Sequence, residues 1–402
     1  MLDKYFDFDT ITPRRNTWSA KWDLLAAPLG DQAVSLSVAD MEYMTSPAIR
    51  QAMKKAAEHG IYGYTEVFDD FSAACSGWLE RRHGWSVESQ DIIFFPRVIE
   101  FIACYVNFIA PQCKVVTMAP RYSPIMEVIE RAGCAITEVD LLQDEQGYTI
   151  DFSALEKEFV HADLFLWCSP HNPTGRVWTK EESIAILDLA RRYKVTVISD
   201  DVHADFVRTH AAHPYIPLPV LGKDLYEKGH LIVCVSPGKT FNTAGLEVAA
   251  ICCGNKELGK TIVSAKRRAG LHNPHYFAIP TAIAAWNDSD EWVDALLCQI
   301  DERIDQACHE LQTHCHNWKV YRPEGTYLLW IETPYMSQSD LEAMVAKTQV
   351  ALSLGEDFGA GYERFFRLNV AVPHKMLTEG LQRLVSYYKE NETLKGNKDN
   401  VN

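Results

Sequence analysis

The chain has 402 residues, of which 47% are hydrophobic and 23% are charged. This is the composition of an ordinary folded protein, and the length exceeds what one compact core needs, so we expect two domains or one large domain with a lobe. The formal net charge of -15 argues against nucleic acid or an anionic membrane surface as a partner.

The first ten residues, MLDKYFDFDT, carry acidic side chains where a secretory signal would be basic and then apolar. No apolar run approaches the roughly 20 residues of a membrane span. We therefore expect a cytoplasmic protein without a membrane partner. The cysteine and histidine clusters at 252–253 and 314–316 lack the paired spacing of a zinc site, so we expect no metal.

Four apolar runs predict buried strands, at 114–119, 164–169, 195–199 and 231–236. These runs are continuous rather than alternating, which is typical of parallel strands covered on both faces. A helix is predicted after Thr179, because TKEE has capping-box spacing and apolar residues then recur at helical spacing. Strands that alternate with helices indicate a parallel sheet wrapped by helices.

The C-terminal third has a different pattern. A long helix is predicted over 289–314, two short strands over 326–333 and 365–371, and a further helix over 339–350 between them. This order indicates a smaller α+β domain. The polar segment 389–402 is expected to be frayed.

Unusual polar residues follow three of the predicted strands, in the segments SPHNPTG, SDDVHADF and SPGKTF. Ligands gather at the carboxyl ends of strands in open parallel sheets, so we expect these segments to form one site. The residues that this site would hold are Asn172, Asp200, His203, Ser236 and Lys239.

The chemistry of these side chains points to one cofactor. A lysine amine against an apolar sheet has a lowered cost of being neutral, and a neutral amine forms a Schiff base with a carbonyl. An acid can keep a pyridine nitrogen protonated, an amide can donate to a phenolate oxygen, and a hydroxyl with backbone N–H groups can hold a phosphate. Each residue alone is common in a structural role, but together they fit pyridoxal 5'-phosphate (PLP).

Three motifs carry a resemblance to a known superfamily. SPHNPTGRVW, VISDDVHADF and SPGKTFNTAGLEVA resemble the fold-type I PLP enzymes, the class I/II aminotransferase superfamily. The stretches RRNTWSAKWD and LSVADMEYMTSPAI, with YGYT at 62–65, resemble the MalY/PatB-type carbon–sulfur β-lyases, which include cystathionine β-lyases and cystalysin. The resemblance runs from about Phe6 to about Leu384.

The resemblance implies an α/β fold with a mainly parallel seven-stranded sheet wrapped by helices, plus a smaller α+β domain. The implied organisation is an N-terminal segment, 1–48, that contributes to the small domain, a large PLP-binding domain over 49–290, a small domain over 291–390 and a flexible tail over 391–402.

It also implies a role for each residue around the cofactor ring. Lys239 would bind PLP covalently and later move the α-proton of the substrate. Asp200 would pair with the pyridine nitrogen, and Asn172 would donate to the phenolate oxygen. Tyr122 would stack on the ring, and His203 would lie near it and support Asp200 or the phenolate side.

The remaining implied roles concern the phosphate and the substrate. Ser236 would bind the phosphate, and Val98 and Ile99 would also contact the cofactor. Tyr64 would reach the phosphate of the cofactor in the neighbouring subunit, which implies a homodimer with shared active sites. Arg367 would take the substrate α-carboxylate by a two-pronged contact.

Three positions depart from the pattern of the relatives. Arg97 occupies a position where relatives carry a small, glycine-like residue, so its guanidinium either helps to hold the phosphate or turns outward. Gly238 stands where relatives often carry serine, which removes one phosphate hydroxyl. Asp201 replaces the glutamate that is common after the pyridine-binding aspartate.

The predicted function is α,β-elimination from a cysteine S-conjugate, which gives a thiol, pyruvate and ammonia. Three alternatives stay open: an aminotransferase on the same fold, another PLP-dependent reaction on a biosynthetic amino-acid conjugate, and a regulatory or binding protein that keeps the fold. The same residues begin elimination and transamination, so the sequence predicts the first step better than the second.

Overall fold

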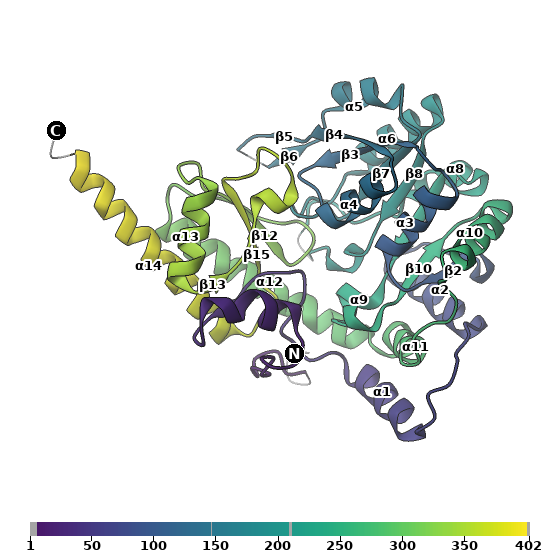
Figure 1. The fold of residues 1–402 in the computed structure, drawn as a ribbon, viewed down its shortest axis with the longest axis horizontal. Helices are drawn as coiled ribbons and strands as arrows, with labels where there is room; N and C mark the ends of the chain where they lie inside the picture. The colour runs from purple at the N-terminus through teal and green to yellow at the C-terminus, as the bar shows by residue number, and fades with distance from the viewer. Residues whose placement is uncertain (1–5, 146, 209–210, 400–402) are drawn as a thin grey trace.

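A seven-stranded sheet forms the centre of the computed structural model, which describes residues 6–145, 147–208 and 211–399 (Figure 1). The strands, in spatial order, are β2 (Ile92–Phe95), β10 (Ala249–Cys252), β9 (Leu231–Val235), β8 (Thr196–Asp200), β7 (Leu164–Cys168), β3 (Lys114–Ala119) and β4 (Ala135–Asp140). The neighbours from β9 to β4 pair in parallel, whereas β10 is antiparallel to both β2 and β9. This confirms the predicted fold class.

The four predicted strands correspond to β3, β7, β8 and β9, and each lies in the interior of the sheet. Their side chains alternate between two cores. Leu164 and Leu166 belong to a core that also contains residues of α3, α4 and α10, whereas Phe165 and Trp167 belong to a core with residues of α5 and α6. Burial on both faces explains why these strands are apolar without interruption.

Helices of the large domain cover both faces of the sheet (Figure 1). Their bounds are α1 (Pro47–His59), α2 (Asp69–His83), α3 (Val98–Phe108), α4 (Ser123–Arg131), α5 (Phe152–Phe159), α6 (Lys180–Tyr193), α7 (Leu218–Leu221), α8 (Lys223–Lys228), α9 (Pro237–Thr240), α10 (Lys256–Arg268) and α11 (Ala278–Asp288). The predicted capping box at Thr179 and Glu182 is present at the start of α6.

The C-terminal part forms a second, four-stranded sheet with the order β11-β12-β15-β14. Its elements are α12 (Asp290–His314), β11 (Lys319–Tyr321), β12 (Leu328–Glu332), α13 (Gln338–Thr348), β13 (Val350–Ala351), β14 (Ser353–Leu354), β15 (Phe365–Asn369) and α14 (His374–Asp399). α14 continues through most of the segment expected to be frayed, while residues 400–402 lie outside the described residues.

The N-terminal segment crosses to this second sheet. Strand β1 (Val34–Ser35) pairs in parallel with β13, and the purple N-terminal chain lies beside the green and yellow C-terminal elements in Figure 1. This pairing supports the assignment of residues 1–48 to the small domain. The domain limits themselves stay a prediction. A separate two-stranded ribbon, β5 (Leu142–Gln143) and β6 (Tyr148–Thr149), extends from the large sheet.

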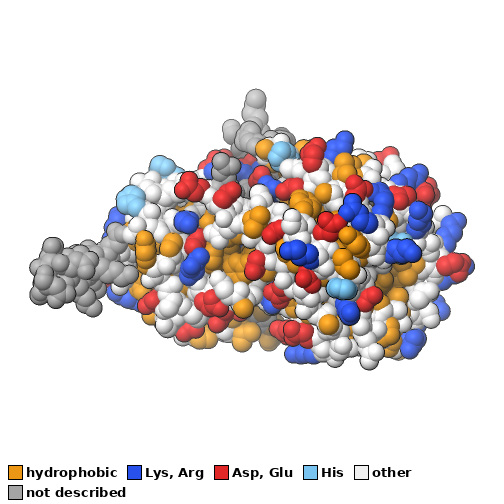
Figure 2. Space-filling view, turned by 90° about the horizontal axis from the view of Figure 1, so that it is seen from above, with side chains coloured by type: hydrophobic (Ala, Val, Ile, Leu, Met, Phe, Trp, Pro, Cys, Tyr) orange, Lys and Arg blue, Asp and Glu red, His pale blue; other side chains and the backbone are white. Residues whose placement is uncertain are grey.

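Acidic and basic side chains are interspersed over the face shown in Figure 2, so neither sign dominates that surface. Among the described residues, every helix is too short or too polar to cross a lipid bilayer. Those residues also hold no group of three histidine, cysteine or acidic side chains placed to share a metal ion.

Candidate active site

The carboxyl ends of five strands meet at one edge of the large sheet. β8 ends at Asp200, β7 ends at Cys168, and β9 leads directly into Ser236. β3 is followed by the turn that carries Tyr122, and β2 is followed by α3, which begins at Val98. The parallel direction of these strands therefore gathers residues that are far apart in the sequence.

A cavity of about 370 Å³ opens at this edge. Its size is within the range of small-molecule sites. The predicted residues that line it are Arg97, Val98, Ile99, Tyr122, Asn172, Asp200, His203, Ser236 and Lys239. The structure thus brings together nine of the predicted residues. Arg367 contacts this group through Asn172, and only Tyr64 lies apart from it.

Lys239 lies in α9, a single helical turn that begins where β9 ends. Ser236 caps this turn, since its hydroxyl accepts a hydrogen bond from the Gly238 N–H at 3.0 Å. The Lys239 Nζ donates to the carbonyl oxygen of Ala39 at 2.7 Å. Burial, followed by the charge of Arg367, lowers the pKa of the Lys239 amine to about 8. The amine is therefore far easier to deprotonate than an ordinary lysine.

Asp200 is the last residue of β8, and its carboxylate faces the cavity. Burial raises the pKa of this carboxyl to about 6, against the opposing effects of the Val202 N–H and of Lys239. The Val202 N–H lies 3.4 Å from Asp200 Oδ1. A buried carboxylate with so little internal compensation is stabilised by a cationic or N–H partner inside the cavity.

Asn172 and Arg367 form a buried pair across the two domains. The Arg367 guanidinium donates to Asn172 Oδ1 at 2.7 Å and lies over the Phe358 ring at 4.7 Å. A guanidinium can only donate, so the amide must present its oxygen to Arg367 and keep its NH₂ group for another acceptor. The sequence did not reveal this contact, because the two residues are 195 positions apart.

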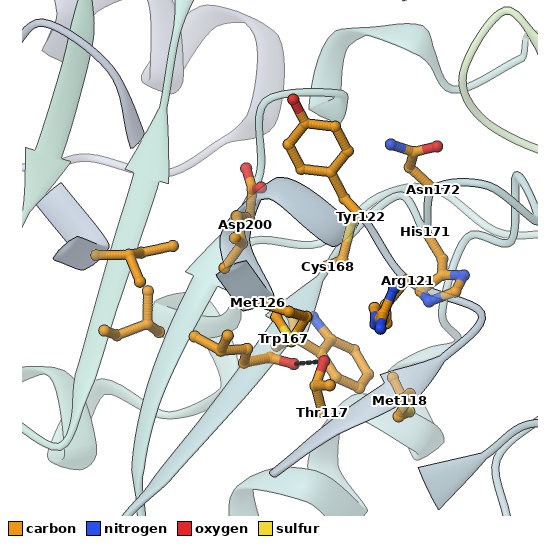
Figure 3. Close-up of a pocket in the computed structure, with 14 residues that line it drawn as sticks. Thr117, Met118, Arg121, Tyr122, Met126, Trp167, Cys168, His171, Asn172 and Asp200 are labelled. Atoms are coloured by element: carbon orange, nitrogen blue, oxygen red, sulfur yellow. Dashed lines mark hydrogen bonds between the residues drawn. The ribbon is translucent and has the colours of Figure 1, made fainter. Parts of the chain in front are cut away.

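Tyr122 is the residue before α4 and remains 44% exposed at the cavity mouth. In Figure 3 its ring lies between Asp200 and Asn172, above Cys168 and Trp167. A smaller cavity beneath it shares Asp200, Asn172 and Cys168 with the main one. Tyr122 therefore lines both cavities together with the acid and the amide, and its stacking role stays a prediction.

His203 has a buried, unpartnered ring nitrogen, Nδ1, that tests the fit of a cofactor. Burial lowers the pKa of the His203 imidazole well below its usual value, so the ring is neutral. Buried polar atoms are rarely left without a partner, and His203 lines the cavity, so a polar group bound there would supply a partner for Nδ1. The lysine, the acid, the amide and this histidine fit the polar atoms of PLP.

The predicted phosphate-binding residues line one cavity, but two of them already have partners within the protein. The Val98 and Ile99 positions begin α3, whose first N–H groups are free to bind an anion. The Ser236 hydroxyl already donates its proton to the Val248 carbonyl at 2.6 Å. The Arg97 guanidinium is half exposed and ion-paired with Glu247 at the cavity edge. The roles of Ser236 and Arg97 toward a phosphate stay predictions.

The glycine at position 238 has a packing reason. A Cβ atom there would lie 3.1 Å from Ser236 Oγ and 3.2 Å from Ala244 Cα. A serine at this position would need the backbone around Ala244 to move. Glycine at position 238 therefore permits the close approach of the segment that follows α9.

Sequence reasoning missed Asp205, whose carboxylate is hydrogen-bonded to α9. Asp205 is largely buried and accepts hydrogen bonds from Trp78, His83 and Thr240. Thr240 is the residue after Lys239, so Asp205 fixes the turn that presents the lysine. No signal in the sequence separates this aspartate from the other acids of SDDVHADF. Asp201, the second of them, instead turns away to bond Ser199 and Tyr215.

Together, the fold and the site define an enzyme of the fold-type I class, which uses PLP. The chain belongs to the aminotransferase class I and II family, whose model matches residues 31–384. It is 33% identical over 94% of its length to cystathionine beta-lyase PatB of Bacillus subtilis (strain 168), and the match spans 98% of that protein. Protein MalY of Escherichia coli (strain K12) is 30% identical, with 95% of this chain and 98% of that protein covered.

A solved structure agrees with these relatives. Cystalysin from Treponema denticola, which contains a pyridoxal 5'-phosphate cofactor, superimposes with a TM-score of 0.90 at 29% identity. That match covers 96% of this chain and 99% of cystalysin. The comparisons confirm the resemblance seen in the motifs.

Proposed function

We propose that this enzyme is a PLP-dependent carbon–sulfur β-lyase that cleaves a cystathionine-like cysteine S-conjugate. With one water, the substrate gives a thiol, pyruvate and ammonia. The observation that carries the proposal is the Lys239 amine, which shares one cavity with Asp200 and with Asn172, the residue that Arg367 bonds. The likeness over nearly the whole chain to a cystathionine beta-lyase supports this chemistry.

The residues around the cavity fit defined parts of the cofactor. Lys239 would hold it covalently, Asp200 would bind the pyridine nitrogen, and the free NH₂ of Asn172 would donate to the phenolate oxygen. Tyr122 would cover the ring, and the first turn of α3 would bind the phosphate, with Ser236 and Arg97 beside it. When bound, PLP supplies a protonated ring that accepts the electron pair left at Cα by proton removal.

Lys239 is the base of this mechanism. A group whose pKa lies near the working pH both takes up and returns a proton, and the pKa of about 8 puts Lys239 in this range. Elimination then requires a good leaving group on Cβ, and a thiolate is one. Without such a group, proton removal by the same base would begin transamination instead.

Arg367 is proposed to bind the substrate carboxylate. Arg367→Ala is expected to raise KM by about 10²-fold, because two charge-assisted hydrogen bonds of about 1.5–3 kcal/mol are lost with partial compensation by water. Arg367→Lys keeps the positive charge but loses the two-pronged guanidinium, so its KM should lie between those of the wild type and Arg367→Ala. Steady-state kinetics test this. An unchanged KM in both variants would remove Arg367 from the substrate site.

Product analysis tests the proposed function directly. The enzyme is incubated with L-cystathionine and with S-alkyl cysteines, with and without a keto acid. We expect thiol, pyruvate and ammonia in equal amounts, independent of the keto acid. Turnover that requires the keto acid and releases no thiol would instead identify an aminotransferase.

We further propose that the enzyme is a cytoplasmic homodimer in which Tyr64 completes the partner's phosphate site. Tyr64 is fully exposed in the single chain, and Ile61, Tyr62 and Phe68 beside it are also largely exposed. These residues border α1 and a hollow of about 860 Å³ that Tyr64 helps to line. Exposed apolar patches of this kind are typical of protein interfaces.

The dimer is tested by light scattering, which should give twice the mass of one chain. Tyr64→Phe should leave that mass unchanged and weaken PLP binding by about ten-fold through the lost hydrogen bond to phosphate. A monomer that binds PLP as tightly with phenylalanine at position 64 would contradict the shared site.

A further inference from the structure

The backbone of residues 38–43, which we call the strap, passes over the lysine of the active site. The carbonyl oxygen of Ala39 accepts the hydrogen bond from Lys239 Nζ at 2.7 Å, and Ala39 also lines the cavity. The strap contributes a backbone atom to this contact and no side chain. The acceptor is a main-chain atom, so the position of this oxygen depends on the contacts that hold the strap.

Asn242, three residues after Lys239, holds the far half of the strap. Its amide accepts from the Met41 N–H at 3.1 Å and donates to the carbonyls of Met41 and Tyr43 at 3.0 and 2.8 Å. Asn242 has a positive φ of 54°, a conformation that asparagine tolerates better than most residues. The segment that carries the lysine is therefore bonded to the segment that receives its amine.

Two further residues hold the strap from other sides. Asn369, at the end of β15, donates to the carbonyls of Val38 and Asp40 at 2.8 and 2.9 Å. Lys21 is completely buried and donates to the Asp40 carbonyl at 2.8 Å. It also pairs with Glu42 Oε1 at 2.9 Å. The carbonyls on both sides of Ala39 are thus fixed.

The backbone at the start of the strap is strained. Val38 has a positive φ of 53°, which is costly for a β-branched residue and persists only where the surroundings impose it. The Val38 N–H bonds the Ser353 hydroxyl at 3.3 Å, and its carbonyl is the one that Asn369 holds. The strap is therefore held in one shape by its contacts rather than by its own preference.

We propose that the strap positions the Lys239 amine for proton transfer, and that Asn242, Asn369 and Lys21 are positioning residues for this step. The inference rests on the proposed function only in taking Lys239 as the base. An amine that donates one N–H to Ala39 must direct its lone pair elsewhere. Because Lys239 lines the cavity, the lone pair is free to point to the place where the substrate's Cα–H would lie.

Charged groups surround the Lys239 amine, whereas the Ala39 oxygen that accepts its hydrogen bond is neutral. Arg367 lowers the pKa of Lys239, while Asp40 and Asp200 raise it. Asp40 is turned away to pair with Arg14 at 2.8 Å. A carbonyl acceptor accepts from the amine in both its neutral and its charged form, so it holds Nζ in place throughout proton uptake and release.

The test compares two variants that loosen the strap from different sides. Asn242→Gly removes three hydrogen bonds and suits the positive φ, and Lys21→Met removes the buried amine with little change in length. Asn255→Gly is the matched control. It deletes an asparagine with comparable bonds, to the Leu258 N–H and the Glu227 carbonyl, at the opposite end of β10.

Proton removal is read separately from elimination. L-alanine lacks a leaving group on Cβ, so exchange of its α-proton in D₂O, followed by NMR, reports the base alone. We expect about ten-fold slower exchange and an equal fall in kcat in both strap variants, since small misplacements of a reacting group have effects of this order or larger. KM and PLP content should stay close to those of Asn255→Gly. The thermal midpoint of Lys21→Met is expected to fall, because Glu42 loses a buried partner, so the rates are compared at a temperature where every variant is folded.

The design separates this inference from the proposed function. If the wild-type enzyme exchanges the α-proton but releases no pyruvate from thioethers, the lyase assignment fails and the strap is still tested. Exchange at the wild-type rate in Asn242→Gly and Lys21→Met would overturn the inference. So would a loss of exchange that merely follows a loss of bound PLP, because that pattern indicates a structural role.

Discussion

Lys239→Ala is expected to lower thiol and pyruvate release by at least about 10⁴-fold, because the variant loses the covalent anchor and the base together. Initial rates with L-cystathionine measure this. PLP that still enters the cavity should be removable by dialysis. Lys239→Arg should be as inactive as the alanine variant, since a guanidinium stays protonated and cannot act as the base.

Lys266→Ala is the matched control for this prediction. Burial also lowers the pKa of the Lys266 amine, but that side chain lies over the Phe94 ring, away from the cavity. Its loss should change stability more than turnover. If Lys239→Ala retained rates within ten-fold of the wild type, Lys239 would not be the base. The contradiction would be complete if Lys266→Ala lost more activity than Lys239→Ala.

Asp200→Asn is expected to lower kcat by about 10²- to 10³-fold, the usual loss when one preorganised electrostatic group is removed from a reacting centre. The amide has the same shape as the carboxylate but cannot hold a protonated pyridine nitrogen by charge. The covalent bond between Lys239 and the cofactor should survive. Rates and visible spectra of the same samples separate these two effects.

The pH dependence supplies a second test of Asp200. Its negative charge raises the pKa of Lys239 against the larger lowering by burial. Asp200→Asn should therefore shift the pKa of Lys239 below about 8, and cofactor-free protein should react with PLP at lower pH than the wild type does, because the neutral amine is the nucleophile. If Asp200→Asn instead reacted with PLP only at higher pH than the wild type, the placement of Asp200 beside Lys239 would be contradicted.

Asp201→Asn is the matched control for both measurements. Asp201 is also buried, and burial raises the pKa of its carboxyl to about 7, but it bonds Ser199 and Tyr215 and does not line the cavity. We expect its kcat to stay within about ten-fold of the wild type. An equal loss in Asp200→Asn and Asp201→Asn would mean that neither acid acts on the cofactor specifically.

The interior of the fold was predictable because burial on both faces leaves continuous apolar runs. β3, β7, β8 and β9 all carry this signal, and the capping box at Thr179 marks the start of α6. β2, β4 and β10 were not located individually. β10 is buried on both faces, but its run is short and half of it is alanine. β4 is a partly exposed edge strand, so its sequence is not a continuous apolar run.

The site was predictable where a residue follows a strand. Asp200, Ser236 and Lys239 were found because parallel strands place their carboxyl ends at one edge. Contacts that depend on tertiary structure carried no sequence signal: the Arg367–Asn172 bond joins two domains, and the Ala39 acceptor is a backbone atom. The orientation of Arg97 was open, and its ion pair with Glu247 is a contact over 150 positions.

Covalent attachment of the cofactor at position 239 is the central claim, and borohydride reduction tests it most directly. Reduction of the PLP-loaded enzyme turns the lysine–cofactor bond into a stable secondary amine, and peptide mapping by mass spectrometry then locates the tag. We predict one tagged peptide, containing Lys239, and none in Lys239→Ala. A tag on another lysine, or an enzyme that turns over thioethers and yields no tagged peptide, would contradict the account.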